Sequence, residues 1–112
     1  MEPSFFRQGN VTIVMPGTRL TALNVPDLET LLLDRIAAEE TAIVLDFSQT
    51  LFIASAGLRA LLRAAKEAEN NGGRLVLCNC SGPVAKVLEI TGFDQLITCY
   101  PSGSEAVSAL TA

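Results

Sequence analysis

Five segments of the chain carry apolar residues in unbroken runs or in alternation, the spacings that predict strands. Residues 42–45 form an unbroken apolar run, which is typical of a strand covered on both faces. Gly9 and Asn10 separate the first two segments and favour a tight hairpin turn, because both residue types tolerate positive φ. The predicted strands are 4–8, 11–15, 41–46, 74–78 and 97–99.

Four other segments carry apolar residues three and four positions apart, the spacing of a helix with one buried face. We expect Asn24 to cap the first of them, which has Pro26 in its first turn, where a missing amide donor costs little. A run of two asparagines and two glycines ends the second helix. The predicted helices are the segment after Asn24, 55–70, 81–91 and 101–111.

A hairpin followed by alternating helices and strands predicts an α/β fold with about four helices. Its sheet should be mixed and mainly parallel, because strand-helix-strand units give parallel pairs while the hairpin adds an antiparallel one. We expect a single domain over residues 1–112. Residues 18–24 and 47–54 are expected to be loops.

The charged residues narrow the possible partners. Eight basic and twelve acidic side chains give a formal charge of −4, which argues against nucleic acid and anionic membranes as partners. No apolar run approaches the ~20 residues that span a bilayer, and the chain begins without a leader pattern, so we expect a cytoplasmic protein. The chain has no histidine, the usual general base of hydrolases and the commonest zinc ligand. We therefore expect a protein that is not an enzyme and uses no cofactor or metal.

The three cysteines are an odd number and are expected to be reduced thiols. In a strand, Cys78 and Cys80 would point to the same face, and we interpret them as small buried apolar residues. A metal site at this pair would lack histidine and a second cysteine pair. A thiol enzyme using Cys78 or Cys80 is an alternative, but no histidine is present to activate either thiol.

Small residues surround Ser55 at the predicted start of the second helix. Ala54 and Ala56 flank it and Gly57 follows, so a partner could approach the backbone closely. The free amides and the positive dipole end of the helix would accept a phosphate on this serine. Two interpretations stay open, because Ser55 could be a regulated site or only a helix cap. Gly57 similarly indicates a close backbone contact, either with a partner or between helix and sheet.

Asp46 ends the apolar strand that leads into the same segment. Its carboxylate could orient the hydroxyls of Ser48 or Thr50 in the following loop, or it could only form a turn. The sequence leaves both interpretations open, and the three residues are candidates for support of the Ser55 site.

Three stretches of the chain, 43–59, 72–79 and 84–93, together resemble the STAS domain of bacterial anti-sigma factor antagonists. They contain, in order, a strand ending Leu-Asp-hydrophobic-Ser, an aromatic-Ile pair, a serine loop followed by Gly-Leu, a Gly-Gly pair before a strand, and Val-x-x-Val-Leu-x-x-Thr-Gly. The match extends over nearly the whole chain and implies a single STAS domain.

The resemblance implies a regulatory binding protein. Family members, when unphosphorylated, bind a serine kinase that is also an anti-sigma factor, and phosphorylation of a loop serine releases them; a serine phosphatase resets the switch. The familiar acceptor position holds Ala56 here, and Thr21 stands where many relatives carry aspartate. Ser55 is the hydroxyl left in the loop proper, so the resemblance assigns the phosphorylation to Ser55.

A neutral surface of small residues could pack against the kinase, and a phosphate there would add bulk and a charge that is costly to bury. A non-switching STAS scaffold, in a signalling assembly or beside a lipid-transport ATPase, is the alternative, and the oligomeric state stays open. The bases Arg59, Arg63 and Lys66 could meet an acidic partner or form a solvated helix face. The expected interface comprises Thr21, Ala54, Ala56, Gly57, Leu58 and Arg59.

Overall fold

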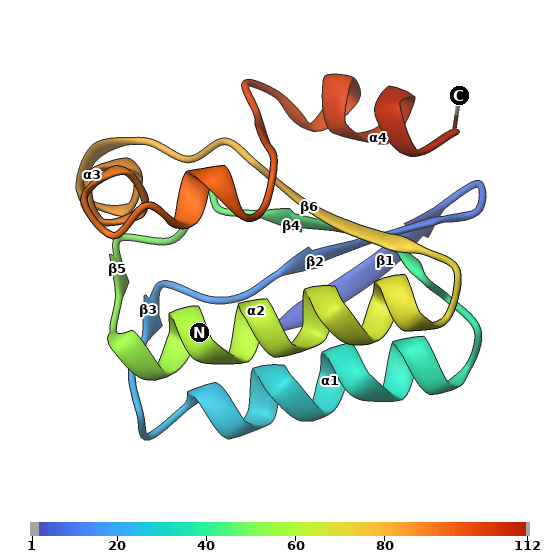
Figure 1. The fold of residues 1–112 in the computed structure, drawn as a ribbon, viewed down its shortest axis with the longest axis horizontal. Helices are drawn as coiled ribbons and strands as arrows, with labels where there is room; N and C mark the ends of the chain where they lie inside the picture. Colours follow the sequence, from blue (N-terminus) through green and yellow to red (C-terminus); the bar gives the residue numbers. More distant parts are fainter. Residues whose placement is uncertain (1–2, 112) are drawn as a thin grey trace.

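A five-stranded mixed sheet forms the centre of the computed structural model, which describes residues 3–111 (Figure 1). The order across the sheet is β1-β2-β4-β6-β7, in which β1 and β2 are the antiparallel hairpin and the other neighbouring pairs are parallel. The predicted hairpin and mainly parallel sheet are therefore confirmed. The bounds of these strands are Ser4–Gln8, Val11–Met15, Ala42–Asp46, Arg74–Cys78 and Cys99–Tyr100.

Helices cover both faces of the sheet (Figure 1). The long helices α1 (Val25–Ala37) and α2 (Ser55–Asn70) lie side by side on one face, and α4 (Gly103–Thr111) covers the other. The shorter α3 (Gly82–Ile90) packs beside the 3-10 turn η1 (Phe93–Gln95), which the sequence pattern did not predict. Within residues 3–111, no helix combines the length and apolar character needed to cross a membrane.

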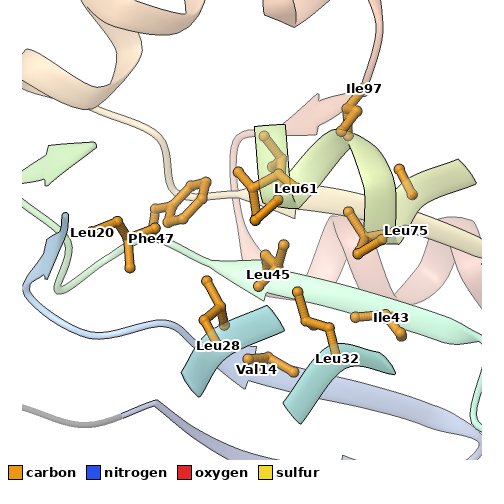
Figure 2. Packing of buried hydrophobic residues seen from close by; sticks show 14 of the residues in the cluster. Val14, Leu20, Leu28, Leu32, Ile43, Leu45, Phe47, Leu61, Leu75 and Ile97 are labelled. Carbon is orange, nitrogen blue, oxygen red and sulfur yellow. The ribbon is translucent and has the colours of Figure 1, made fainter. Parts of the chain in front are cut away.

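Burial on both faces explains the unbroken apolar run of the central strand β4. Ile43 and Leu45 pack into the cluster beneath α1 and α2, while Val44 packs into the smaller cluster beneath α4. Figure 2 shows Leu28 and Leu32 of α1 close to these β4 side chains. Alternate residues of β4 thus pack into the cores on opposite faces of the sheet. Both sets must therefore be apolar, which produces an unbroken apolar run.

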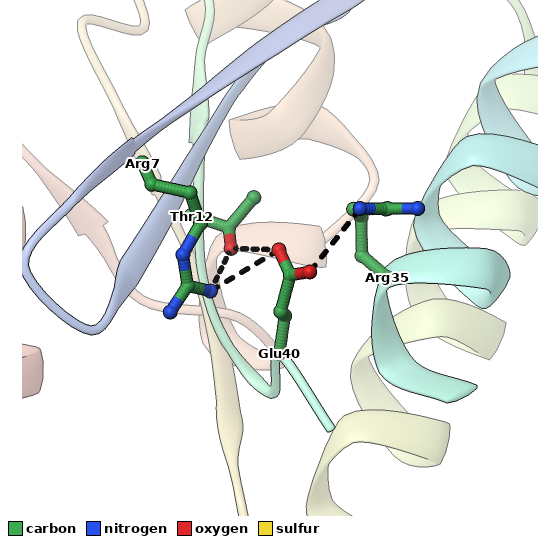
Figure 3. Close-up of polar contacts among 4 residues, drawn as sticks. All are labelled: Arg7, Thr12, Arg35 and Glu40. Carbon is green, nitrogen blue, oxygen red and sulfur yellow. Dashed lines mark hydrogen bonds and ion pairs between the residues drawn. The ribbon is translucent and has the colours of Figure 1, made fainter. Parts of the chain in front are cut away.

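A polar network closes the amino end of the parallel strands (Figure 3). The Thr12 side chain, at 0% exposure, accepts a hydrogen bond from Arg7 Nη1 at 2.7 Å and donates one to Glu40 Oε1 at 3.0 Å. The other Glu40 oxygen pairs with Arg35 Nη1 at 3.1 Å, and the Arg35 guanidinium lies 4.6 Å from the centre of the Phe5 ring. The network joins the hairpin to the end of α1.

A close backbone approach lies at the same end of the sheet. Gly73 directly precedes β6, and a Cβ atom placed there would collide with the side chain and carbonyl oxygen of Thr41. The Arg74 amide donates a hydrogen bond to that same carbonyl oxygen at 2.8 Å. Only glycine fits at position 73 without moving the backbone.

The structure corrects three expectations about local structure. Residues 18–24 and 47–54 are not entirely loops, because Arg19–Leu20 (β3) and Phe52–Ile53 (β5) pair as a small parallel sheet. The last strand of the main sheet lies at Cys99–Tyr100 instead of 97–99, since the buried Ile97 packs into the core. The Asn24 side chain does not cap α1: its oxygen accepts from the Thr21 amide at 2.8 Å, which ties it to the preceding turn.

Candidate functional site

Ser55 is the first residue of α2 and is exposed to solvent. Ala54, and not Ser55, occupies the capping position before the helix, so the interpretation of Ser55 as a helix cap is wrong. Within the described part of the chain, its hydroxyl has no hydrogen-bond partner and the first turn of α2 contains no acidic residue. The hydroxyl therefore lies beside the positive end of the helix dipole with no side chain competing for it.

The small sheet of β3 and β5 fixes the backbone that leads to Ser55. The Ala54 amide donates to the Leu20 carbonyl oxygen at 2.8 Å, which continues the pairing of Arg19 with Phe52. Thr50 is buried, and its hydroxyl donates to the Gly17 carbonyl oxygen at 2.7 Å. These bonds hold the segment before Ser55 against the segment that follows β2.

Gly57 lies in the first turn of α2 and is buried. A Cβ atom at this position would lie 3.1 Å from Ile53 Cγ2 and 3.3 Å from Leu20 Cβ, tighter than ordinary packing allows. Of the two contacts that the sequence left open, the structure shows the one between helix and sheet. Gly57 supports the surface around Ser55 from below and is not part of that surface.

Asp46 organises the turn after β4. Its Oδ1 accepts a hydrogen bond from the Ser48 amide at 2.9 Å and another from Asn79 Nδ2 at 3.1 Å. It does not bond to the hydroxyls of Ser48 or Thr50, so of the two interpretations the turn-forming one holds. Asp46 also joins the ends of the neighbouring strands β4 and β6, because Asn79 directly follows β6.

Exposed apolar side chains occur in the two segments that precede α1 and α2. Leu23, Leu51 and Phe52 are 92%, 61% and 39% exposed, and the Arg19 guanidinium lies 4.7 Å from the centre of the Phe52 ring. Thr21, Ala54, Ala56 and Leu58 are partly buried, and Arg59 is exposed. We call Leu23, Leu51, Phe52, Ala54 and Ala56, together with Ser55, the serine surface.

A surface groove of about 380 Å³ opens beside this surface, between the starts of α1 and α2. Ala22, Pro26, Ala56 and Arg59 are among the residues that line it. Arg63 also lines the groove, but an ion pair of 3.0 Å with Glu29 partly neutralises its charge. The groove therefore combines apolar walls with the basic Arg59 side chain, next to the candidate phosphorylation site.

Comparison with known proteins identifies the family of this chain. The model of the STAS domain matches residues 3–106. The chain belongs to the STAS domain family. BtrV of Bordetella bronchiseptica, named as an anti-sigma factor antagonist, is 34% identical to it over 90 residues, which cover 80% of this chain and 78% of BtrV.

Solved structures confirm the STAS fold. TM1081 of Thermotoga maritima, also named as an anti-sigma factor antagonist, superposes with a TM-score of 0.91 at 24% identity, covering 97% of this chain and 94% of that one. SpoIIAA from Bacillus in its phosphorylated form gives a TM-score of 0.73 at 20% identity, with 96% of this chain and 97% of that chain covered. SpoIIAA has also been solved in an unphosphorylated form. At these identities the likeness concerns the fold.

Cys78 and Cys80 of this STAS domain do not share a face. Cys78 is buried in the cluster under α4, whereas Cys80 packs against the cluster under α1 and α2. The strand ends between them, because Asn79 has a positive φ of 57° and breaks the alternation that the sequence interpretation assumed. Burial and the nearby Asp46 carboxylate raise the pKa of Cys78 to about 12, which opposes a nucleophilic role for that thiol. Residues 3–111 contain no group of three or more candidate ligands placed to hold a metal.

Sequence reasoning missed the apolar part of the serine surface. Leu23, Leu51 and Phe52 lie in segments that were expected to be loops, where hydrophobic side chains carry no periodic pattern. One signal in the sequence could have indicated these exposed side chains, namely the apolar run Leu51-Phe52-Ile53 after polar residues. In a strand, neighbouring side chains point to opposite faces, so burial of Ile53 turns Phe52 outward.

Proposed function

We propose that this STAS domain is an anti-sigma factor antagonist that switches partners through Ser55. Without phosphate, the serine surface binds a serine kinase that acts as an anti-sigma factor, and a sigma factor is thereby released for transcription or a related pathway. Phosphorylation of Ser55 by the kinase breaks the complex, and a serine phosphatase restores the binding form. The observation that carries the proposal is the exposed, unbonded Ser55 hydroxyl within an apolar surface at the start of α2.

The local electrostatics support phosphorylation in the free protein. The amides of Ser55 and Ala56 lie in the first turn, where helix amides have no partner within the helix, and no acidic residue occupies that turn. A phosphoserine adds a charge of about −1.5 to −2 at neutral pH. The helix start can therefore stabilise the phosphate while it is in contact with water.

The same phosphate is unfavourable once a partner covers it. Leu23, Leu51 and Phe52 form apolar neighbours for a partner, and transfer of a charge into an apolar contact costs far more than the loss of one hydrogen bond. The side chains of Ala54 and Ala56 add no polar group that could compensate. Phosphorylation therefore weakens binding mainly through desolvation of the new charge.

The relatives agree with this role. BtrV and TM1081 are named as anti-sigma factor antagonists, and SpoIIAA is known in phosphorylated and unphosphorylated forms. In this role the chain needs no catalytic group of its own, because the kinase and the phosphatase perform the chemistry in the cytoplasm. A STAS domain that only serves as a scaffold would lack the modification.

The test measures phosphorylation of this protein by candidate anti-sigma serine kinases of the same organism, and its binding to them. Incubation with ATP is expected to place one phosphate on Ser55, located by peptide mass spectrometry. Ser55→Asp is expected to weaken kinase binding at least about tenfold, equivalent to ~1.4 kcal/mol, while Ser55→Ala keeps it. Ser104→Asp is the matched control, because Ser104 is also an exposed serine in the first turn of a helix, α4.

Two results would count against the switch. If Ser55→Asp and Ser55→Ala bind the kinase equally well, the charge at Ser55 does not control the complex. If binding is strong and no phosphate appears on Ser55, the scaffold role replaces the switch.

A further inference from the structure

Two cysteines meet at the edge of the sheet where β6 and β7 end. Cys80 follows β6 by two residues, and Cys99 is the first residue of β7, which pairs with β6. Their sulfur atoms lie 2.6 Å apart, although the residues are 19 positions apart in the sequence. Formation of a disulfide would require the sulfur atoms to approach by only about a further 0.5 Å.

Small solutes can reach this pair. Both side chains are partly buried and line a surface pocket of about 220 Å³, whereas the third cysteine, Cys78, is buried in the core. The pocket opens between α3 and η1, which contribute Glu89 and Asp94 to its wall. The pocket is too small for a folded partner but can admit a peroxide molecule.

The two thiols have different acidities. The side-chain interaction with Cys80 lowers the pKa of Cys99 to about 7, against the opposing effects of burial and the Asp94 charge. The same interaction, together with burial, raises the pKa of Cys80 above its ordinary range. The directions of these two shifts favour Cys99 over Cys80 as the nucleophile of the pair.

We propose that Cys80 and Cys99 are a peroxide-oxidised thiol pair that closes to a reversible disulfide. The Cys99 thiolate attacks one oxygen of hydrogen peroxide, the O–O bond breaks, and sulfenic acid and hydroxide form. The Cys80 sulfur then attacks the sulfenic sulfur; a disulfide forms, and the hydroxyl leaves with the Cys80 proton as water. The two thiols lose two electrons in total, and peroxide gains them. A small dithiol reverses the reaction by thiol–disulfide exchange.

The cross-link would tie the start of α3 to β7. Cys80 lies two residues before Gly82, where α3 begins, and α3 packs against β5, the strand that leads to Ser55. Oxidation would thus restrain α3, which contacts the β5 strand that leads to the serine surface. The proposal itself depends only on the thiol pair and stands or falls separately from the proposed switch.

The test exposes the reduced full chain to hydrogen peroxide and counts the remaining thiols. The expected result is rapid loss of two thiols of the three, a Cys80–Cys99 cross-linked peptide in mass spectrometry, and full recovery with dithiothreitol. Cys80→Ala is expected to leave a sulfenic acid on Cys99 that dimedone traps, and Cys99→Ala is expected to lose the rapid reaction. Cys78→Ala is the control and should behave as the unmodified chain.

A second readout measures the alkylation rate of Cys99 against pH. It is expected to rise with pH around a midpoint of about 7 in the unmodified chain, because the thiolate is the reacting form. In Cys80→Ala the midpoint should move upward, since the stabilising hydrogen bond is lost while Asp94, Glu89 and Cys78 are unchanged. Retention of all three thiols, a cross-link that includes Cys78, or cross-links only between chains would overturn the proposal.

Discussion

The two ends of the parallel strands in this STAS domain differ in chemistry and packing. At the amino end, Glu40 joins three polar side chains and Gly73 packs directly on the Thr41 backbone. At the carboxyl end, several apolar side chains and the unbonded hydroxyl of Ser55 face solvent. Ion pairs and close packing thus complete one end within the chain, whereas the other end leaves groups available for other molecules.

Under the proposed function, stability depends on one end of the strands and recognition on the other. The carboxyl ends of parallel strands commonly carry functional loops, and here both the serine surface and the Cys80–Cys99 pair lie there. Substitutions at the amino end should therefore change the free energy of unfolding and leave binding intact. Substitutions in the serine surface should do the reverse.

Gly73→Ala should give the largest effect. The new methyl group would collide with Thr41 backbone and side-chain atoms, so the free energy of unfolding should fall by about 3 kcal/mol, measured by urea denaturation. Gly103→Ala is the control, because its Cβ would meet open space at the start of α4. Equal stability of the two variants would contradict the close packing described for the amino end.

Glu40→Gln should give an intermediate loss of stability. It removes the negative charge that faces Arg7 and Arg35, and an amide cannot reproduce every hydrogen bond of the carboxylate. We expect a loss of about 2 kcal/mol in the free energy of unfolding, with kinase binding by the folded protein unchanged. The matched control is Glu39→Gln at the exposed neighbouring position; a loss as large there would assign the effect to net charge.

Leu51→Ser should show the smallest effect, and only in binding. Leu51 is 61% exposed, so its replacement should change the free energy of unfolding by less than about 0.5 kcal/mol. Loss of its apolar contact with the kinase should weaken binding about tenfold, measured by calorimetry. Leu96→Ser is the control, because Leu96 is 63% exposed and lies outside the serine surface. Similar losses from both variants would show that the serine surface is not the specific contact.

The local pattern of apolar residues was sufficient to predict the elements that are long or fully buried. The apolar run in β4, the turn at Gly9 and Asn10, and the helical periodicity of α2 each reflect contacts that the neighbouring residues determine. The small sheet escaped prediction, because β3 and β5 have two residues each and exist only by pairing across 33 positions. Such pairing leaves no periodic signal in either segment.

Of the candidate site, the sequence predicted Ser55 but not the exposed apolar residues of the serine surface. Small neighbours and the helix start identified Ser55, but its place after the cap depended on Ala54 bonding to Leu20. The meeting of Cys80 with Cys99 also could not be read from spacing, because it requires the break at Asn79 and the pairing of β7 with β6. In each case the deciding contact lies far away in the sequence.

The pairing of β3 with β5 also affects the entropy of recognition. A free segment loses about 1–2 kcal/mol of backbone conformational entropy per residue when a partner fixes it. Here the bonds of Thr50, Leu51 and Ala54 to residues 17–20 fix the segment before any partner arrives. Under the proposed function, binding would therefore order little additional chain, so even a small contact area would hold a partner, and the introduction of one charge would be enough to release it.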